Sequence, residues 1–180
     1  ALETLLVHRK YPVSWLANIL LKMQNSGVEL RVCQKTKKRL ESYPNLNLSL
    51  AKNIDWETEY VDLILSIKTV KSAEEAVEHI TKFGSKHTES IVTENSDLAE
   101  WFMKTVDAAG VFWNASTRFA DGFRYGLGAE VGISTGKTHA RGPVGLEGLV
   151  IYKYKLYGNG HVVGNYGEGK KDFLHMEIKL

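Results

Sequence analysis

The order of apolar runs and amphipathic stretches between residues 61 and 113 constrains the fold most. Residues 61–70 are rich in Val, Ile and Leu, as a buried strand requires. Two helical patterns follow, and each leads into a further short apolar run, at residues 91–93 and 111–113. Two consecutive strand–helix–strand units indicate parallel strands joined by right-handed helical crossovers. The sequence therefore predicts an α/β fold with a mostly parallel sheet and helices on both faces.

The first half of the chain fits the same architecture. Residues 4–8 form a short apolar run that is typical of a buried strand. A helix with one apolar stripe is expected over residues 14–27, with Ser14 as its cap. Residues 28–33 alternate as a strand does, and a short basic helix at about residues 35–42 then leads to a strand-like stretch.

Cap residues predict where the two later helices begin. Ser72 with Glu75 matches a capping box, and Asp97 with Glu100 suggests a second one. A glycine closes each of the two helical patterns. Both helices are therefore expected to begin at a side-chain cap.

Composition excludes several classes of protein. A net charge of +2 is too small to indicate nucleic-acid binding, and no apolar run approaches the roughly 18 residues that cross a bilayer. The single cysteine, Cys33, excludes an internal disulfide framework. No His, Cys, Asp or Glu set has metal-ligand spacing, so we predict no metal. Because Ala1 is not Met, the chain is expected to be a piece of a longer protein.

A glycine-rich segment follows the strand predicted at residues 111–113. Nine of the sixteen glycines lie between Gly110 and Leu149, among Asn, Ser, Thr and Arg side chains. A loop of this composition on a rigid scaffold is typical of a binding site. Residues 114–118 leave the carboxyl end of the strand, which is where ligands bind in open α/β sheets.

Three motifs of this segment carry a family resemblance. They are NASTRF at residues 114–119, GLGAEVGIS at 126–134 and HARGP at 139–143. They resemble the signature of the γ-glutamyl phosphate reductases, also called glutamate-5-semialdehyde dehydrogenases, of the aldehyde dehydrogenase superfamily. Phe112-Trp113 and residues 142–149 are most similar to the reductase part of the bifunctional animal pyrroline-5-carboxylate synthases. The resemblance covers nearly the whole chain.

The resemblance implies an oxidoreductase of proline biosynthesis that reduces γ-glutamyl phosphate to glutamate 5-semialdehyde with NADPH. It also implies a cysteine nucleophile just upstream of Ala1, and neither that cysteine nor a glycine-rich nucleotide-binding unit is in this sequence. Cys33 stands in an unrelated context and is expected to be structural. The chain alone is therefore expected to be inactive. The alternative hypothesis is a non-catalytic unit that supplies a substrate loop and an oligomerisation arm.

Arg118 is the leading candidate for substrate binding. Its planar guanidinium with paired donors matches a phosphate or an α-carboxylate. The alternative is that Arg118 pairs with Asp121 and only holds the loop together, and the two roles are compatible. The whole predicted substrate-binding set is Asn114, Ser116, Thr117, Arg118, Asp121 and Gly122.

Other residues are assigned through the resemblance, each with a plainer alternative. Glu59 stands where aldehyde dehydrogenases carry a glutamate that contacts the nicotinamide ribose, although a surface carboxylate fits as well. Glu130 either lines the substrate site or bonds backbone amides in a turn. His87 is either an acid–base group or a residue that orders its loop. His139 and Arg141 are equally suited to interdomain and catalytic roles.

Three parts of the chain are expected. Residues 1–135 form the thiol-side catalytic domain without its nucleophile, and residues 136–148 return toward a missing cofactor domain. Residues 149–180 form a β arm and tail, with a hairpin turn at Gly158-Asn159-Gly160. A lone hairpin is marginal in water, so the arm is expected to pair with another subunit of a homo-oligomer. The parent is expected to be mitochondrial if it is of the animal bifunctional type and cytoplasmic otherwise.

Overall fold

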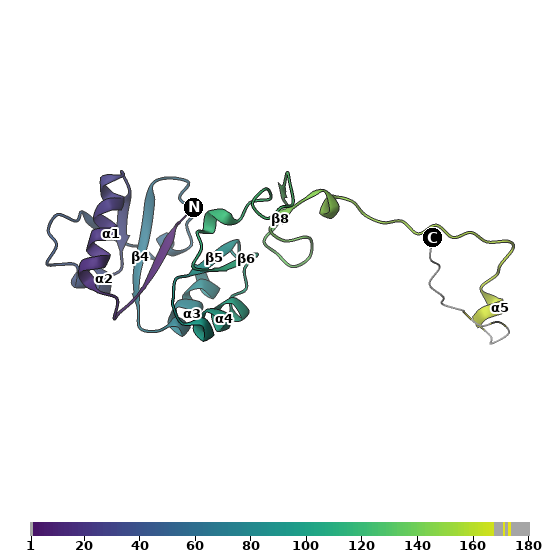
Figure 1. The fold of residues 1–180 in the computed structure, drawn as a ribbon, viewed down its shortest axis with the longest axis horizontal. Coiled ribbons are helices and arrows are strands. Elements are labelled where there is room, and N and C mark those ends of the chain that lie inside the picture. The colour runs from purple at the N-terminus through teal and green to yellow at the C-terminus, as the bar shows by residue number, and fades with distance from the viewer. Residues whose placement is uncertain (1, 168–170, 172, 174–180) are drawn as a thin grey trace. The chain divides into compact units, whose positions relative to one another are not determined.

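The computed structural model describes residues 2–167, 171 and 173. The chain divides into two compact units, residues 1–149 and residues 150–180, which are described separately (Figure 1). The first unit carries nearly all of the helices and all of the strands assigned among the described residues. Its parallel strands and covering helices confirm the predicted α/β fold.

A four-stranded parallel sheet forms the centre of the first half of this unit. Its order is β1-β4-β2-β3, in which β4 is paired on both sides. The strands are β1 (Thr4–His8), β2 (Glu29–Val32), β3 (Leu48–Leu50) and β4 (Ile64–Val70). β4 begins later than the predicted residue 61, because Val61 adopts a φ of 50° and lies in the turn before it.

One face of this sheet is apolar and is covered by α1 (Val13–Asn25) and α2 (Gln34–Arg39). Leu20 of α1 packs with Val32 and Ile67 of the sheet, and all three are 0% exposed. No side chain caps α1, which begins after Pro12 rather than at the predicted Ser14 cap. The helix ends before Gly27, whose φ of 87° favours glycine.

The other face of the sheet is polar. Arg31 lies directly across from Ser66 in the register of β2 and β4, and Lys68 shares their face because it follows Ser66 by two residues. The short 3-10 helix η1 (Asn53–Trp56) and helix α3 (Ala73–Phe83) cover this side through contacts to Arg31 and Lys68. The prediction of helices on both faces is thus confirmed.

A second, two-stranded parallel sheet pairs β5 (Thr88–Ile91) with β6 (Gly110–Trp113) across helix α4 (Ser96–Thr105). This strand–helix–strand unit is as predicted. The preceding one, β4–α3–β5, does not close within one sheet, since β5 pairs with β6 and both edges of β4 are already taken by β1 and β2. Val77 of α3 packs with Phe102 and Val106 to form the core of this half.

The predicted caps of α3 and α4 have different outcomes. Ser72 caps α3 by accepting a hydrogen bond from the Glu75 amide, and the Glu75 carboxylate accepts one from the Lys71 amide. The cap predicted at Asp97 is wrong. Asn95 occupies the cap position of α4 and accepts from the Leu98 amide at 2.9 Å, because its side chain stands one residue ahead of the first helical turn.

The glycine-rich segment contains little regular structure. It includes the 3-10 turn η2 (Thr117–Phe119), a short antiparallel pair of β7 (Val131–Gly132) with β8 (Pro143–Val144), and the 3-10 turn η3 (Leu146–Leu149). Val144, at 4% exposed, and Gly122 are the buried residues among the described residues 114–149. The division at residue 135 into a catalytic part and a return segment stays a prediction.

The β arm predicted for the second unit requires a pairing partner, and it stays a prediction. Residues 150–163 form no strand in the described part of the chain, and a short helix α5 (Gly164–Gly167) follows them. Ile151 is 95% exposed and Tyr154 is 89% exposed. A strand needs a hydrogen-bonded partner, and the hairpin that was to provide one is too weak on its own. The end of the predicted tail, residues 168–170, 172 and 174–180, lies outside the described residues.

Candidate functional site

The carboxyl ends of β5 and β6 are joined by the side chain of Asn114. Its Oδ1 accepts from the Thr93 amide at 2.9 Å and its Nδ2 donates to the Thr93 carbonyl at 2.9 Å. The indole of Trp113 donates to the same carbonyl at 2.8 Å. Asn114 has a φ of 52°, a left-handed conformation that asparagine tolerates better than most residues. Its amide group therefore shapes the loop from which the predicted substrate residues emerge.

Ser116 and Arg118 stand on the next turn. The Ser116 hydroxyl accepts from the Arg118 amide at 3.3 Å and so caps η2, which also contains Thr117. Arg118 is exposed, and within residues 2–167 its guanidinium forms no ion pair. The alternative in which Arg118 pairs with Asp121 is not what the loop shows.

Asp121 instead pairs with Arg124. Its Oδ1 accepts from the amides of Phe123 and Arg124 at 3.0 and 3.2 Å, and Oδ2 lies 3.5 Å from the Arg124 guanidinium. Arg124 also donates to the carbonyl of Arg118. The holding role that sequence reasoning gave to Arg118 thus belongs to Arg124, and the guanidinium of Arg118 stays exposed at the strand end.

Gly122 is buried where two parts of the loop meet. A Cβ there would lie 2.6 Å from the Gly128 carbonyl oxygen and 2.7 Å from the Cβ of Glu130, so a side chain does not fit. The Glu130 side chain is exposed, and in the described part of the chain its carboxylate accepts no backbone amide. The role of Gly122 that the structure supports is therefore close packing of the loop.

Arg141 fixes the segment predicted to return toward a cofactor domain. Its guanidinium donates to the Asp107 carboxylate at 2.7 Å and to the Asp107 carbonyl at 3.2 Å, and Lys137 lies 3.0 Å from the same carboxylate. Hydrogen bonds from Arg141 and Lys137 lower the pKa of Asp107. The Nε of Arg141 is buried without a partner among the described residues. His139 is exposed on the same segment, and within residues 2–167 no hydrogen bond or ion pair joins it to Arg118.

His87 orders the start of β5. Its Nδ1 lies 2.7 Å from the Thr88 hydroxyl, and its carbonyl accepts from the Gly110 amide at 2.9 Å. These bonds fit the loop-ordering alternative for this residue.

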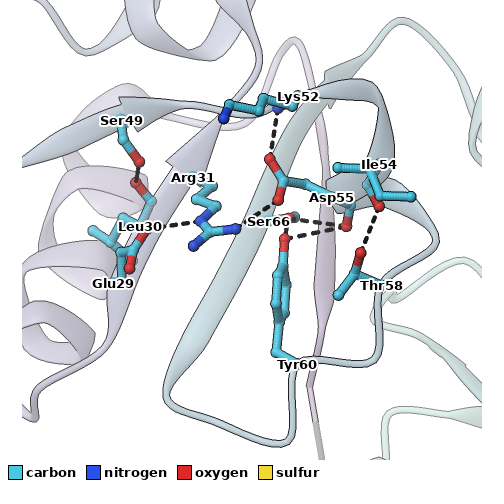
Figure 2. A network of polar contacts seen from close by, with 10 residues as sticks. All are labelled: Glu29, Leu30, Arg31, Ser49, Lys52, Ile54, Asp55, Thr58, Tyr60 and Ser66. Atoms are coloured by element: carbon cyan, nitrogen blue, oxygen red, sulfur yellow. Dashed lines mark hydrogen bonds and ion pairs between the residues drawn. The ribbon is translucent and has the colours of Figure 1, made fainter.

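Glu59 lies on the connection from β3 to β4, far along the chain from Arg118. Its side chain is exposed, while both neighbours in sequence are bonded back to η1. Thr58 Oγ1 donates to the Ile54 carbonyl at 2.7 Å, and the Tyr60 hydroxyl bonds the Asp55 carbonyl at 3.2 Å (Figure 2). The predicted cofactor residue is thus held on a tethered turn.

Asp55 anchors that turn on the polar face of the sheet. It is 4% exposed, accepts from the Lys52 amide at 2.6 Å, and lies 2.6 Å from the Arg31 guanidinium (Figure 2). Burial by itself would raise the pKa of the Asp55 carboxyl, but hydrogen bonds from Lys52 and Arg31 outweigh it and lower the pKa. Arg31 also binds Glu29 at 2.7 Å, and its guanidinium lies over the Tyr60 ring, 5.1 Å from the centroid.

Two carboxyl groups, that of Glu3 just before β1 and that of Glu89 in β5, have raised pKa values. Burial, and then the charge of Glu59, raise the pKa of Glu3. Burial, and then the charge of Glu3, raise the pKa of Glu89 to about 7. A hollow of about 90 Å³ beside Glu89 is lined also by Lys86 and Asp107. Pockets for small-molecule ligands usually measure about 300–1,000 Å³, so this hollow is not a complete substrate site.

Cys33 has a structural environment. Its sulfur caps α2 by accepting from the Thr36 amide at 3.4 Å, and it lies 3.2 Å from the Thr36 hydroxyl. Burial acts to raise the pKa of the thiol, but hydrogen bonds, led by those from Thr36, outweigh burial and lower it. These contacts fit the predicted structural role. No group of three or more potential metal ligands occurs in the part of the chain that the structure describes.

Sequence reasoning missed a second set of polar contacts on the polar face of the four-stranded sheet, between Lys68 and His79. His79 of α3 is 5% exposed, and its Nδ1 lies 2.9 Å from the Lys68 ammonium. Burial, and then the charge of Lys68, lower the pKa of His79 to about 4. Its Nε2 is buried without a partner among the described residues. The usable signal was the position of Arg31 and Lys68 inside apolar strand runs, where a partly buried cation requires polar partners.

None of the described helices combines the length and the apolar character that crossing a bilayer takes.

No protein-family model matches the sequence. The curated relatives that match it include γ-glutamyl phosphate reductases from Acetivibrio thermocellus (53% identical over 178 residues), Pelotomaculum thermopropionicum (52% over 178 residues) and Haloquadratum walsbyi (53% over 181 residues). Each match covers 99% of this chain but 40% of the relative, so the chain spans about 40% of their length.

Solved structures give the same result. The crystal structure of γ-glutamyl phosphate reductase from Thermotoga maritima matches 89% of this chain and 37% of its own, at 48% identity and a TM-score of 0.79. The enzyme of that name from Saccharomyces cerevisiae matches 91% of this chain and 36% of its own, at 32% identity and a TM-score of 0.51. The resemblance to γ-glutamyl phosphate reductases is confirmed, and the narrower one to animal bifunctional enzymes stays a prediction.

Proposed function

We propose that this chain is part of a γ-glutamyl phosphate reductase, which reduces γ-glutamyl phosphate to glutamate 5-semialdehyde with NADPH in proline biosynthesis. The observation that carries the proposal is 53% identity to a reductase of that name along 99% of this chain. Because the chain spans 40% of that relative, catalysis, cofactor binding and assembly are proposed for the whole protein.

Arg118 is the proposed anion-binding residue of the substrate site. It is exposed at the carboxyl end of β6, and the loop around it is held by other side chains. A guanidinium binds a phosphate or carboxylate through paired hydrogen bonds. Ser116 and Thr117 on the same turn are proposed to complete the contact. Asn114, Asp121 and Gly122 are proposed to contribute by holding the loop in shape.

Glu59 is the proposed contact of this chain to NADPH, which supplies the hydride when bound. An exposed carboxylate on a tethered turn fits that group, because ribose hydroxyls donate hydrogen bonds to such a side chain. Glu59 is also close enough to Glu3 to raise its pKa, and Glu3 lies near the start of the chain. Most of the NADPH site is expected outside this chain.

The function is tested with the longer protein that contains this sequence. The convenient assay is the reverse reaction, the phosphate-dependent oxidation of glutamate 5-semialdehyde with NADP⁺. We expect turnover by the longer protein and none by the 180-residue chain, which lacks a nucleophile at the site. Turnover by the chain alone that Cys33→Ser abolishes would overturn this reading.

Arg118 is tested in the same longer protein. Hydrogen bonds to charged groups contribute about 1.5–3 kcal/mol, so Arg118→Ala should lower kcat/KM roughly tenfold to a hundredfold. Arg118→Lys should restore part of the loss, and NADPH affinity should stay the same. Arg124→Ala is the matched control. It removes the guanidinium that holds the loop, so it should lower Tm more than it changes the KM for the glutamyl substrate. A destabilised Arg118→Ala enzyme with unchanged KM for the glutamyl substrate contradicts the assignment.

A second proposed function is subunit pairing by residues 150–163. Exposed apolar side chains mark protein contacts, and Ile151 is 95% exposed. The proposed partner is a second copy of this chain. Removing residues 150–180 from the longer protein should reduce its oligomeric state in sedimentation velocity. An unchanged state contradicts this role.

The proposed location depends on the longer protein. We propose a mitochondrial location if the longer protein carries the animal bifunctional arrangement, and a cytoplasmic one otherwise. A glutamate kinase domain upstream of the reductase would establish the bifunctional arrangement.

A further inference from the structure

We propose that Tyr60 and Ser66 are positioning residues, which hold the Glu59 turn in place against the beginning of β1. The inference rests on the proposed function, because it concerns how Glu59 is presented to NADPH. It assigns a role to a buried polar network that neither the substrate loop nor the apolar core accounts for.

The first step concerns the turn itself. Residues 51–63 leave β3 and return to β4, and Glu59 lies in this connection. The Thr58 hydroxyl ties one side of Glu59 to the Ile54 carbonyl at 2.7 Å. The Tyr60 hydroxyl ties the other side to the Asp55 carbonyl at 3.2 Å and to the Ser66 hydroxyl at 2.7 Å (Figure 2). Both neighbours of Glu59 are therefore fixed while its own carboxylate stays exposed.

The second step concerns the anchor beneath the turn. The buried Asp55 carboxylate is held by the Lys52 amide and by Arg31, each at 2.6 Å, and Arg31 also lies over the ring of Tyr60 (Figure 2). Charge-assisted hydrogen bonds of this length are directional and strong. The position of η1 on the sheet is thus set by β2, and Tyr60 is bonded to that fixed element.

The third step links the turn to the beginning of the chain. Ser66 is 0% exposed and lies on the central strand β4. Its amide donates to the Glu3 carbonyl at 2.9 Å, while its hydroxyl bonds Tyr60. One buried residue therefore holds both the Glu59 turn and the start of β1.

The test uses the longer protein with single-atom changes in the network. Tyr60→Phe removes the hydroxyl but keeps the ring under Arg31, and Ser66→Ala removes the other hydroxyl of the pair. Ser49→Ala is the matched control: Ser49 lies across from Arg31 in the register of β2 and β3, and its hydroxyl donates to the Leu30 carbonyl at 3.2 Å. The measured quantities are Kd for NADPH by fluorescence titration, KM for glutamate 5-semialdehyde, and Tm.

We expect Tyr60→Phe and Ser66→Ala to raise the Kd for NADPH about twofold to tenfold, the range that the loss of one hydrogen bond produces. The KM for glutamate 5-semialdehyde should change less than about twofold, and Ser49→Ala should leave both constants unchanged. Glu59→Gln should also raise the Kd for NADPH. Adding Tyr60→Phe to Glu59→Gln should then add little, because residues that act through one contact are not additive.

Three outcomes would overturn the inference. If Glu59→Gln raises the Kd while Tyr60→Phe and Ser66→Ala do not, the positioning role alone is lost. If Tm, Kd and KM all change in proportion, the two residues are only structural. If Glu59→Gln leaves the Kd unchanged, Glu59 is no cofactor contact and has nothing to be positioned for. A longer protein without any reductase turnover would instead end the proposed function itself.

Discussion

The two faces of the four-stranded sheet are built from opposite chemistry. One face buries Leu, Ile and Val against α1 and α2, and its central members Leu20, Val32 and Ile67 are 0% exposed. The other face carries Arg31, Ser66 and Lys68, and it is covered by a turn and a helix that bring their own polar groups. The same four strands therefore support two different kinds of contact.

The difference separates stability from positioning. Burial of apolar surface is favourable in any orientation, so the apolar face stabilises the sheet without fixing fine geometry. Hydrogen bonds and ion pairs are directional, and leaving one buried partner unpaired is costly. The polar face accordingly holds one arrangement of the Glu59 turn. Asp55 contributes to this through its carboxylate, which accepts from Arg31 and from the Lys52 amide, and through its carbonyl, which accepts from Tyr60.

The largest effect is expected on the apolar face. Ile67→Ala in the 180-residue chain should lower the free energy of unfolding by about 2–5 kcal/mol, because it removes buried methyl groups and leaves a cavity. Urea unfolding followed by circular dichroism measures this loss. Ile151→Ala, at a residue that is 95% exposed, is the control and should change stability by less than about 0.5 kcal/mol. Equal losses of unfolding free energy in the two variants would contradict the stabilising role of the apolar face.

The polar face should respond less to removal of its anchor. Asp55→Asn weakens the pair with Arg31 and should lower the free energy of unfolding by about 1–3 kcal/mol. The folded-state pKa of Asp55 is lowered, so its contribution is present above the unfolded value of about 3.9 and is lost as pH falls through the folded value. The variant should lack that part of the acid-induced loss. Identical pH profiles below pH 4 would contradict the prediction.

Sequence pattern was sufficient for the fold class and for the order of elements in the first unit, because each element carries its own local signal. The periodicity of α3 with its Ser72 cap, and the Val- and Ile-rich β4, were identified in the right order. The division into two sheets was not predictable in this way, since it depends on which strand edges are free, and that is a property of the assembled sheet. Residues 150–157 form no strand on their own for a related reason, because a strand requires a partner, and the β arm stays a prediction.

The candidate site was predictable only in part. Glycine density and strand-end position located the loop of Arg118, and these are local signals. The exchange of roles between Arg118 and Arg124 depends on side-chain packing three to six residues apart, which no pattern specifies. The network of Arg31 with Asp55 joins residues 24 positions apart and appeared only when the turn was placed on the sheet.

His79 on the polar face should make the stability of the protein depend on pH, which the apolar face does not. Its pKa is lowered to about 4 by burial and by Lys68, with Lys82 acting in the same direction and Glu75 opposing them. The unfolded state binds a proton below about pH 6.5 and the folded state does not, so stability falls as pH decreases from 6.5 toward 4. The expected loss is about 1–2 kcal/mol between pH 6.5 and 5. His79→Gln should flatten the profile over this range, and an unchanged slope would show that His79 is protonated in the fold.

The smallest effect is expected at the exposed partner of Arg31. The Glu29 side chain is 51% exposed and lies 2.7 Å from Arg31, whereas the Asp55 side chain is 5% exposed and lies 2.6 Å away. Water and salt screen the exposed pair, so Glu29→Gln should lower the free energy of unfolding by less than about 1 kcal/mol. That loss should vanish in 1 M NaCl, while the loss in Asp55→Asn should largely persist. One guanidinium thus serves as its own control for burial, at nearly equal distances and opposite exposure. If Glu29→Gln costs as much as Asp55→Asn at every salt concentration, depth on the polar face does not decide which contact fixes the turn.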